Sequence, residues 1–301
     1  MDDVAVEPNP TVVFVLGGGG VHGAVQVGML QALQEHDIRP DLILGTSVGA
    51  MNGAMLAARP DDTVQRLRAL WTNLADYSPF EASLLERAST LTRSRTHLHG
   101  NHRLRRLLLS YLPARTFGEL VVPFQCVAAS IERAGARWFA DGPLIDALLA
   151  STAVPGLLPP VALGGEHYLD GGLVDSIPVG RALELGATCI YVLQVGRVEQ
   201  PLRVPTKPWE VGLIAFEIAR RHRFVEAMGR VPEGVEVHVL PTGLSDAMDF
   251  TDPAQFRYRD TTKAAERMET AHLASSAYLT ERQRPARRAG RDGGAARAEE
   301  G

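Results

Sequence analysis

The chain of 301 residues has two cysteines, no long uncharged apolar run and no excess of positive charge. Because Cys126 and Cys189 lie in apolar, strand-like segments, we expect reduced core residues and neither a disulfide framework nor a metal site. The lack of an apolar run argues against a transmembrane helix. The net charge of -4 gives no reason to expect a nucleic acid partner.

The N-terminal segment, MDDVAVEPNP, has no hydrophobic stretch of the kind that forms a secretory signal. We therefore expect a cytoplasmic protein. The length suffices for one large α/β domain, or for two small ones, with a sizeable core.

Short β-branched runs alternate with helical spacing in the first part of the chain. Residues 11–16 and 41–44 form apolar runs typical of buried strands, while 21–35 and 48–58 have the spacing of helices. This order of strand, loop, helix, strand, turn and helix predicts the start of a parallel sheet with crossover helices.

The rest of the chain has weaker patterns. Residues 62–74 have the spacing of an amphipathic helix, and apolar runs at 123–128, 187–195 and 236–240 predict further strands. Residues 78–102 are polar and rich in arginine and histidine, and we expect them to form a surface excursion or cap over the sheet.

These patterns divide the chain into four expected segments. Residues 1–10 form an N-terminal arm, 11–180 the core with the candidate site, and 181–281 the remainder of the same α/β domain. The last segment, 282–301, is a polar tail rich in arginine, glycine and alanine. Such a composition cannot form a core, so we expect the tail to be disordered.

Ser47 lies in a run of small residues, Gly45-Thr46-Ser47-Val48-Gly49, between the second strand and the next helix. A strand that turns sharply into a helix crowds the positions two before and two after the turn, and glycine fits there because it has no Cβ. The run is typical of a nucleophile elbow with Ser47 at its tip. The alternative is a glycine-rich turn whose serine caps the helix.

A second glycine-rich loop, Gly18 to Gly23, matches the G-x-G-x-x-G pattern of dinucleotide sites. Such a site also needs an acidic residue at the end of the next strand, where this chain has Leu44, so we expect no nucleotide cofactor. Neighbouring parallel strands place their C-terminal loops side by side. The backbone N–H groups of Gly18, Gly19 and Gly20 are therefore expected to face the serine and to stabilise an oxyanion.

The base for the serine is expected in the segment YLDGG at 168–172. A short apolar approach ends there in Asp170, and Gly171 and Gly172 let the backbone turn away from its carboxylate. A carboxylate beside a serine hydroxyl acts as its base when burial keeps it basic. The alternative is an ordinary Asp-Gly hairpin turn.

The histidines offer a different base, because an α/β-hydrolase triad has an aspartate and then a histidine after its serine. Its elbow normally follows several strands, whereas this one follows two. His222 and His272 lie in charged helical segments, and His238 lies in an alternating strand. The three histidines between residues 97 and 102 lie in the polar excursion. These positions favour Asp170 over any histidine.

Four blocks in this order resemble the patatin-like phospholipase family, whose members are lipid acyl hydrolases with a Ser–Asp dyad. The blocks are the glycine loop at 18–23, the elbow at 45–49, the run ASTAVPGLLPP at 150–160 and the Asp-Gly-Gly at 170–172. The resemblance covers about half of the chain. It implies a three-layer α/β/α fold with a mainly parallel central sheet.

The resemblance also implies roles for individual residues and an activity. Ser47 is the nucleophile, Asp170 is the general base and the glycine loop forms the oxyanion hole. The implied activity is hydrolysis of carboxylic esters in phospholipids or other acyl lipids, of phospholipase A, lysophospholipase or esterase type. No metal or cofactor is implied, and the protein would contact membranes peripherally.

The alternatives are acyl transfer by the same dyad, or a non-catalytic lipid-binding relative. Further motif positions are Gly23, Gly45, Gly49, Gly171 and Gly172.

His22 departs from the family, whose members usually carry arginine or lysine at this position. Histidine is mostly neutral at pH 7, so its charge would appear only on the acidic side. His22 is a candidate contact for an anionic head group beside the oxyanion loop. The alternative is that it points away and packs against the first helix.

Overall fold

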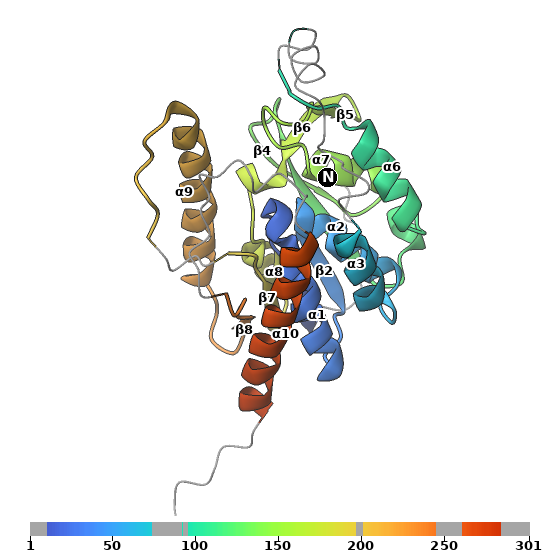
Figure 1. The fold of residues 1–301 in the computed structure, drawn as a ribbon, viewed down its shortest axis with the longest axis vertical. Coiled ribbons are helices and arrows are strands. Elements are labelled where there is room, and N and C mark those ends of the chain that lie inside the picture. Colours follow the sequence, from blue (N-terminus) through green and yellow to red (C-terminus); the bar gives the residue numbers. More distant parts are fainter. Residues whose placement is uncertain (1–10, 74–91, 93–95, 197–200, 245–260, 284–301) are drawn as a thin grey trace, which may run out of the picture.

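The computed structural model describes residues 11–73, 92, 96–196, 201–244 and 261–283 (Figure 1). The expected N-terminal arm at 1–10, most of the expected excursion at 78–102 and the expected tail beyond 283 lie outside these residues.

A sheet of eight strands forms the centre of the described part of the chain. The strands are β1 Val12–Leu16, β2 Leu42–Thr46, β3 Phe124–Ser130, β4 Gly135–Phe139, β5 Val161–Leu163, β6 Glu166–Asp170, β7 Cys189–Leu193 and β8 Glu236–Val239. They follow the order β5-β6-β3-β2-β1-β7-β8, with β4 beside β3. From β3 to β8 all neighbours pair in parallel, whereas β4, β5 and β6 add antiparallel pairs.

Helices cover both faces of this sheet. They are α1 Ala24–Glu35, α2 Val48–Ala58, α3 Thr63–Thr72, α6 His102–Tyr111, α7 Leu144–Ser151, α8 Val179–Glu184, α9 Pro208–Met228 and α10 Thr261–Gln283. Single 3₁₀ turns lie at Gly20–Gly23, Phe117–Glu119 and Gly171–Leu173. Figure 1 shows α1 and α10 side by side in front of the sheet, and α9 on the left of the view.

Alternating side chains of β1 divide the core into two layers, since successive strand residues point to opposite faces. Phe14 and Leu16 pack with residues of α1, α2, α3, α6, α7 and α10. Val13 and Val15 pack with residues of α8 and α9 on the other face. The three layers confirm the α/β/α class with a mainly parallel sheet.

Most predicted elements are present with small changes in their bounds. The strands predicted at 11–16, 41–44, 123–128, 187–195 and 236–240 correspond to β1, β2, β3, β7 and β8. The first helix begins later than predicted, at Ala24, because the glycines before it form a 3₁₀ turn.

The predicted start of the disordered tail was wrong by two residues, because α10 continues through Gln283. Leu279 is buried at 2% exposure, and the Arg282 guanidinium lies 5.6 Å from the Tyr278 ring centroid. His36 Nδ1 and Gln283 Oε1 lie 2.9 Å apart, which ties the last residue of α10 to the end of α1. These contacts offset the unfavourable composition.

The cysteines differ in their surroundings. Both are free thiols; Cys126 is buried in β3, and Cys189 is half-buried at the start of β7.

Of the helices in the described ranges, none combines the length and the apolar character needed to cross a bilayer.

The contact between α1 and α10 depends on Gly28. A Cβ placed on this glycine would lie 2.0 Å from the carbonyl oxygen of Met268 and 2.7 Å from the amide nitrogen of His272. The two helix backbones therefore approach more closely than any other residue at this position would allow.

We predict that Gly28→Ala lowers the free energy of unfolding by about 1–3 kcal/mol, because the added methyl pushes α10 away from α1. Gly180→Ala is the matched control, since its Cβ would lie 3.9 Å from the nearest atom, Ala227 Cβ. Alanine favours a helix over glycine, so this control should be neutral or stabilising by up to about 1 kcal/mol. Urea unfolding measures both, and equal stabilities of the two variants would contradict the close packing.

Candidate active site

Ser47 lies at a sharp turn between β2 and α2. Its backbone has φ 54° and ψ -122°, a conformation that few residues other than glycine adopt. A Cβ on Gly49 would lie 2.1 Å from the carbonyl oxygen of Leu16, and one on Gly45 would lie 2.6 Å from Ala50 Cα. The two glycines therefore let strand and helix pack closely while the serine side chain projects from the tip.

The strand β3 places the ends of β2 and β6 against each other. Its first half pairs with β2, so that Thr46 lies opposite Val127, and its second half pairs with β6, so that Asp170 lies opposite Ala128. Because β4 pairs with β3 from Cys126 to Ser130 and so overlaps both stretches, β2 and β6 lie on the same edge of β3 and meet end to end. The residue after β2 is Ser47, so the register itself places the serine beside the aspartate.

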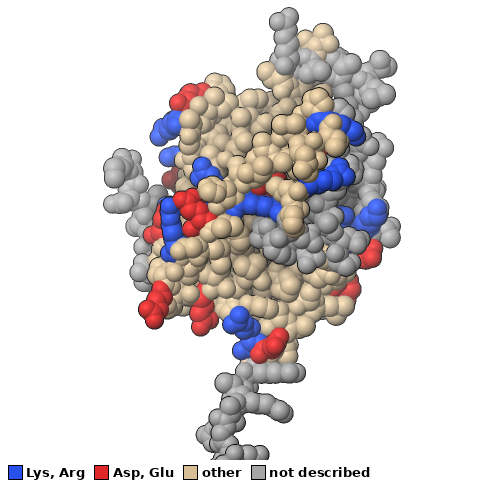
Figure 2. Space-filling view, turned by 90° about the vertical axis from the view of Figure 1, so that its left-hand side faces the viewer, with Lys and Arg blue, Asp and Glu red and all other residues tan. Residues whose placement is uncertain are grey.

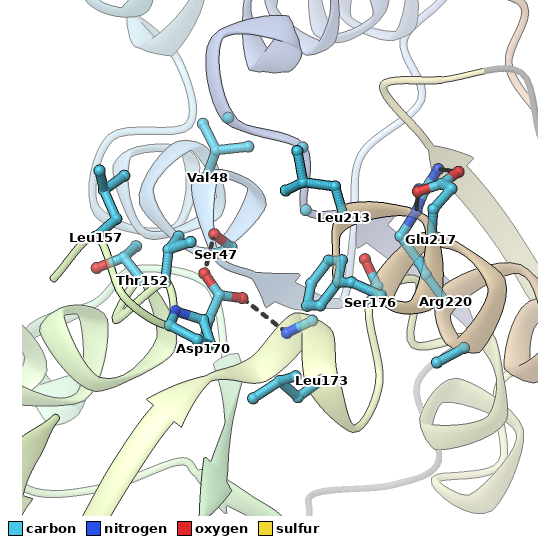
Figure 3. A pocket seen from close by; sticks show the side chains of 18 of the residues that line it. Ser47, Val48, Thr152, Leu157, Asp170, Leu173, Ser176, Leu213, Glu217 and Arg220 are labelled. Carbon is cyan, nitrogen blue, oxygen red and sulfur yellow. Dashed lines mark hydrogen bonds and ion pairs between the residues drawn. The ribbon is translucent and has the colours of Figure 1, made fainter. Parts of the chain in front are cut away.

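The two side chains are hydrogen-bonded (Figure 3). Ser47 Oγ donates to Asp170 Oδ2 at 2.6 Å, and the Gly172 amide donates to Asp170 Oδ1 at 2.8 Å. A Cβ on Gly171 would lie 2.1 Å from the Val127 carbonyl oxygen, so glycine is needed where β6 turns away from β3. One carboxylate oxygen is thereby held by the backbone, and the other faces the serine hydroxyl.

Burial makes Asp170 an unusually basic carboxylate. The side chain is 2% exposed, and desolvation raises the pKa of Asp170 from 3.8 to about 6, although the hydrogen bonds from Ser47 and the Gly172 amide favour the charged form. The carboxylate is thus mostly ionised at neutral pH and binds a proton more readily than an exposed aspartate.

The glycine loop after β1 lies against the serine. A Cβ on Gly18 would lie 3.3 Å from Ser47 Cβ. However, the Gly18 amide already donates to the Ser176 carbonyl oxygen at 3.0 Å, so this predicted oxyanion donor is engaged. Among the described residues the amides of Gly19 and Gly20 make no hydrogen bond, and these two remain candidate donors.

Two buried polar side chains, which we had not singled out in the sequence, hold this loop. Gln26 of α1 donates to the carbonyl oxygens of Gly17 and Leu193, both at 2.8 Å. Asn52 of α2 donates to the Gly23 carbonyl oxygen at 3.0 Å and to Gln26 Oε1 at 2.8 Å. A single amide in an otherwise apolar helix, as in AVQVGML and VGAMNGAML, is the sequence pattern that could have indicated them.

A cavity of about 610 Å³ opens beside the serine. Its lining is mostly apolar and comes from α2, α6, α9, the loop after α7 and the 3₁₀ turn Gly171–Leu173. Val48, Met51, Leu104, Val154, Leu157, Leu173, Leu213 and Phe216 are part of it. Figure 3 shows Ser47 and Asp170 on one side of this cavity and the buried ion pair of Glu217 and Arg220 on the other. The sequence contains no motif that assigns a function to the residues of α9.

His22 belongs to the 3₁₀ turn Gly20–Gly23 and is not part of the cavity lining. The side chain is 8% exposed, and burial, assisted by the charges of Arg267 and Arg220, lowers the pKa of His22 to about 4. A neutral, buried imidazole does not form the anion contact considered for this position. The alternative, in which His22 points away and packs against the first helix, is consistent with this burial.

The other histidines within the described ranges also lie away from the cavity lining. His272 Nε2 lies 2.6 Å from Glu35 Oε2, and His238 Nδ1 lies 3.2 Å from the Tyr278 hydroxyl. His222 is on the exposed side of α9. None of these positions supports a histidine base for Ser47.

One cluster has donor types that bind metal ions. Potential ligand atoms of Cys189, Glu236 and His238 lie within 4.8 Å of one another at the start of β7 and β8. The starts of β7 and β8 are the N-terminal ends of parallel strands, whereas Ser47 follows the C-terminal end of β2. The cluster and Ser47 therefore lie toward opposite ends of the parallel strands. The His238 ring stacks on Tyr191 with centroids 4.8 Å apart, so packing accounts for its position.

Because Asp170 is buried, its ionisation in the folded protein lowers the free energy of unfolding as the pH rises from about 4 to about 6. Asp170 has a higher pKa in the folded chain than its ordinary 3.8, so its contribution to stability is fully present below about pH 4 and is lost as the pH rises through about 6. We expect Asp170→Asn to be more stable than wild type at pH 8, and this advantage to shrink by about 2 kcal/mol at pH 4. Urea unfolding at the two pH values measures it. An advantage that is the same at both would contradict the raised pKa.

Comparison with known proteins identifies relatives of this chain. The family described as Patatin-like phospholipase matches residues 14–183. The patatin-like phospholipase domain-containing protein ZK370.4 of Caenorhabditis elegans is 32% identical over 189 residues, which are 62% of this chain and 14% of that protein. Lysophospholipase nte1 of Aspergillus terreus is 31% identical over 189 residues, 63% of this chain and 12% of that protein. Patatin-like phospholipase domain-containing protein 7 of Mus musculus is 29% identical over 187 residues, 62% of this chain and 14% of that protein.

Two solved structures also align with the chain. VipD from Legionella pneumophila aligns with a TM-score of 0.46 and 16% identity over 91% of this chain and 67% of that one. The type III effector ExoU aligns with a TM-score of 0.34 and 15% identity over 92% of this chain and 54% of that one. The curated relatives are much longer proteins, of which the matched part covers 12% to 14%. The family match covers more than half of the chain, and the protein therefore belongs to the patatin-like phospholipase family.

Proposed function

We propose that the protein is a serine lipid acyl hydrolase that cleaves carboxylic esters of phospholipids or other acyl lipids. The observation that carries this proposal is the 2.6 Å hydrogen bond from Ser47 Oγ to Asp170 Oδ2 at the turn between β2 and α2. A hydroxyl that donates to a buried carboxylate has its proton acceptor already in place. The family membership and the lysophospholipase nte1 relative support the same class of reaction.

In the proposed first step, Ser47 Oγ attacks the ester carbonyl carbon and its proton passes to Asp170 Oδ2. The carbonyl oxygen becomes an oxyanion, for which the amides of Gly19 and Gly20 are the donors; one well-placed donor of this kind contributes about 3–4 kcal/mol. The C–O bond to the alcohol then breaks, and the leaving alcohol takes the proton from Asp170. An acyl group remains bound to the serine.

In the proposed second step, a water molecule attacks the acyl carbon while Asp170 accepts one of its protons. The bond to Ser47 Oγ breaks, the proton returns to the serine, and the free fatty acid leaves. The carboxylate thus acts as base and then as acid in each half of the reaction. The ester, one water molecule and the side chains of Ser47 and Asp170 account for every atom and proton in these steps.

The cavity suits an acyl chain. It borders the serine, and its apolar residues lie on both sides of Ser47 and Asp170. Burial of each methylene of a bound chain contributes about 0.8 kcal/mol. The substrate class we propose is therefore an acyl lipid, which the protein meets at a membrane or lipid surface.

We predict that a fluorophosphonate probe labels Ser47 and that Ser47→Ala abolishes both labelling and esterase activity, because the variant has no nucleophile. Ser176→Ala is the matched control, since Ser176 also lines the cavity but its Oγ has no hydrogen-bond partner among the described residues. This control should still be labelled. Mass spectrometry of the labelled peptides decides, and labelling of a folded Ser47→Ala protein would refute the assignment.

A second prediction concerns pH. Because Asp170 must be ionised to accept the proton, kcat/KM for a soluble ester should rise with pH through about 6 and then level off. Asp170→Asn keeps the shape of the side chain but not the base, and should lower kcat by about 10²–10⁴-fold. A wild-type profile that falls between pH 5 and pH 7, or an active Asp170→Asn variant, would speak against Asp170 as the base.

A further inference from the structure

The helix α9 exposes an apolar stripe on its outer side. Val211, Ile218 and Val225 are exposed by 55%, 55% and 62%, and they lie seven residues apart, which places them along one side of an α-helix. Other strongly exposed apolar side chains of the described residues, such as Val121 and Leu273, lie on separate elements. The stripe on α9 is therefore more than the scattered exposure that is normal for a surface.

The same helix forms a wall of the substrate cavity. Phe216, Glu217 and Arg220 line the cavity from its inner side, and Gly212 and Ala219 line it while also being exposed. Small exposed residues therefore separate the apolar stripe from the cavity. Val211 and Ile218 of the stripe are each followed in the sequence by one of these exposed lining residues, so the stripe lies beside the cavity along α9.

The charge of this region differs from that of the whole chain. Residues 201–230 contain six arginines and lysines and three glutamates, whereas the chain has a net charge of -4. Lys207, Arg223 and Arg230 lie on the surface, where Lys207 pairs with Glu210 and Arg230 pairs with Glu226, so the excess of positive charge remains after these pairs are formed. Figure 2, which faces the α9 side, shows a mostly uncharged surface with basic groups across its middle and acidic groups mainly to the left and below.

We propose that α9 docks on an anionic lipid bilayer, with the stripe of Val211, Ile218 and Val225 inserted at the interface. Helices with an apolar face and basic neighbours bind in this way, because apolar burial and attraction to anionic lipids act together. The inference deepens the proposed function, since it rests on a substrate that resides in a lipid layer. Docking through this stripe brings the cavity-lining residues of α9 to the lipid interface.

The test is co-sedimentation with vesicles of phosphatidylcholine, with and without phosphatidylglycerol. All proteins carry Ser47→Ala, so that binding is measured without turnover. The triple variant Val211→Gln, Ile218→Gln, Val225→Gln removes the stripe, and none of these residues is part of the cavity lining. Glutamine is a better helix former than valine, so the variant should keep α9. The matched control is Val121→Gln, Ile131→Gln, Leu273→Gln, three exposed apolar residues on other elements.

We expect the stripe variant to bind the anionic vesicles about tenfold more weakly than its parent, and the control variant to bind like the parent. Binding should also weaken at high salt and on pure phosphatidylcholine. Equal binding of the stripe variant and its parent would overturn the proposal, as would an equal loss in the control. A parent that elutes as a dimer, and a stripe variant that elutes as a monomer, would instead identify the stripe as an interface between copies.

A second readout separates this inference from the proposed function. In proteins that retain Ser47, hydrolysis of a soluble short-chain ester should be the same with and without the stripe, while hydrolysis of vesicle phospholipid should fall with the binding. If wild type binds vesicles through the stripe but hydrolyses no ester, the proposed function fails and the docking inference stands. If the stripe variant hydrolyses vesicle phospholipid as fast as wild type, the docking inference fails and the function stands.

Discussion

The candidate site depends on the pairing of one strand, β3, with two different strands along the same edge. The parallel strand β2 ends opposite Val127, and the antiparallel strand β6 ends opposite Ala128. The two chain ends therefore point at each other, and the residues at the junction are Ser47 and Asp170. Loops could not place a 2.6 Å hydrogen bond between residues 123 positions apart as reproducibly as this register does. Other features of the site support this arrangement. The glycines beside Ser47 and Asp170 allow close backbone contacts, and the side-chain amides of Gln26 and Asn52 hold the glycine loop.

This arrangement opposes the stability of the fold in two ways. Ser47 is held in a backbone conformation that costs about 1–3 kcal/mol, and Asp170 is an ionised carboxylate that is almost fully buried. Both features are stable because two layers of helices pack on the sheet and because the Gly172 amide and the Ser47 hydroxyl bond the carboxylate. The same burial that lowers stability makes Asp170 a better proton acceptor. The desolvation of Asp170 thus affects both the stability of the fold and the proposed reactivity.

The sequence was most informative where local geometry requires particular residues. Glycine on either side of Ser47, and Gly171 after Asp170, are needed because a Cβ would meet backbone atoms, so these positions could be recognised without a structure. The first strands and helices were also predicted within a few residues, because their apolar periodicity is strong. The function of α9 was not predicted, since its inner wall and exposed stripe are distinguishable only once the cavity is known. Nor could the sequence show that the Gly18 amide is engaged, because its partner, the Ser176 carbonyl, is distant along the chain.

The central claim is that Ser47 and Asp170 act as one unit, and a double-mutant cycle tests it most directly. The kcat/KM of a soluble ester is measured for wild type, Ser47→Ala, Asp170→Asn and the protein with both substitutions. Residues that act in one step are strongly non-additive, so the account predicts that the double variant is no slower than the slower single variant. Losses that multiply, so that the double variant is slower by the product of the two single effects, would show that the residues contribute independently and would contradict the dyad.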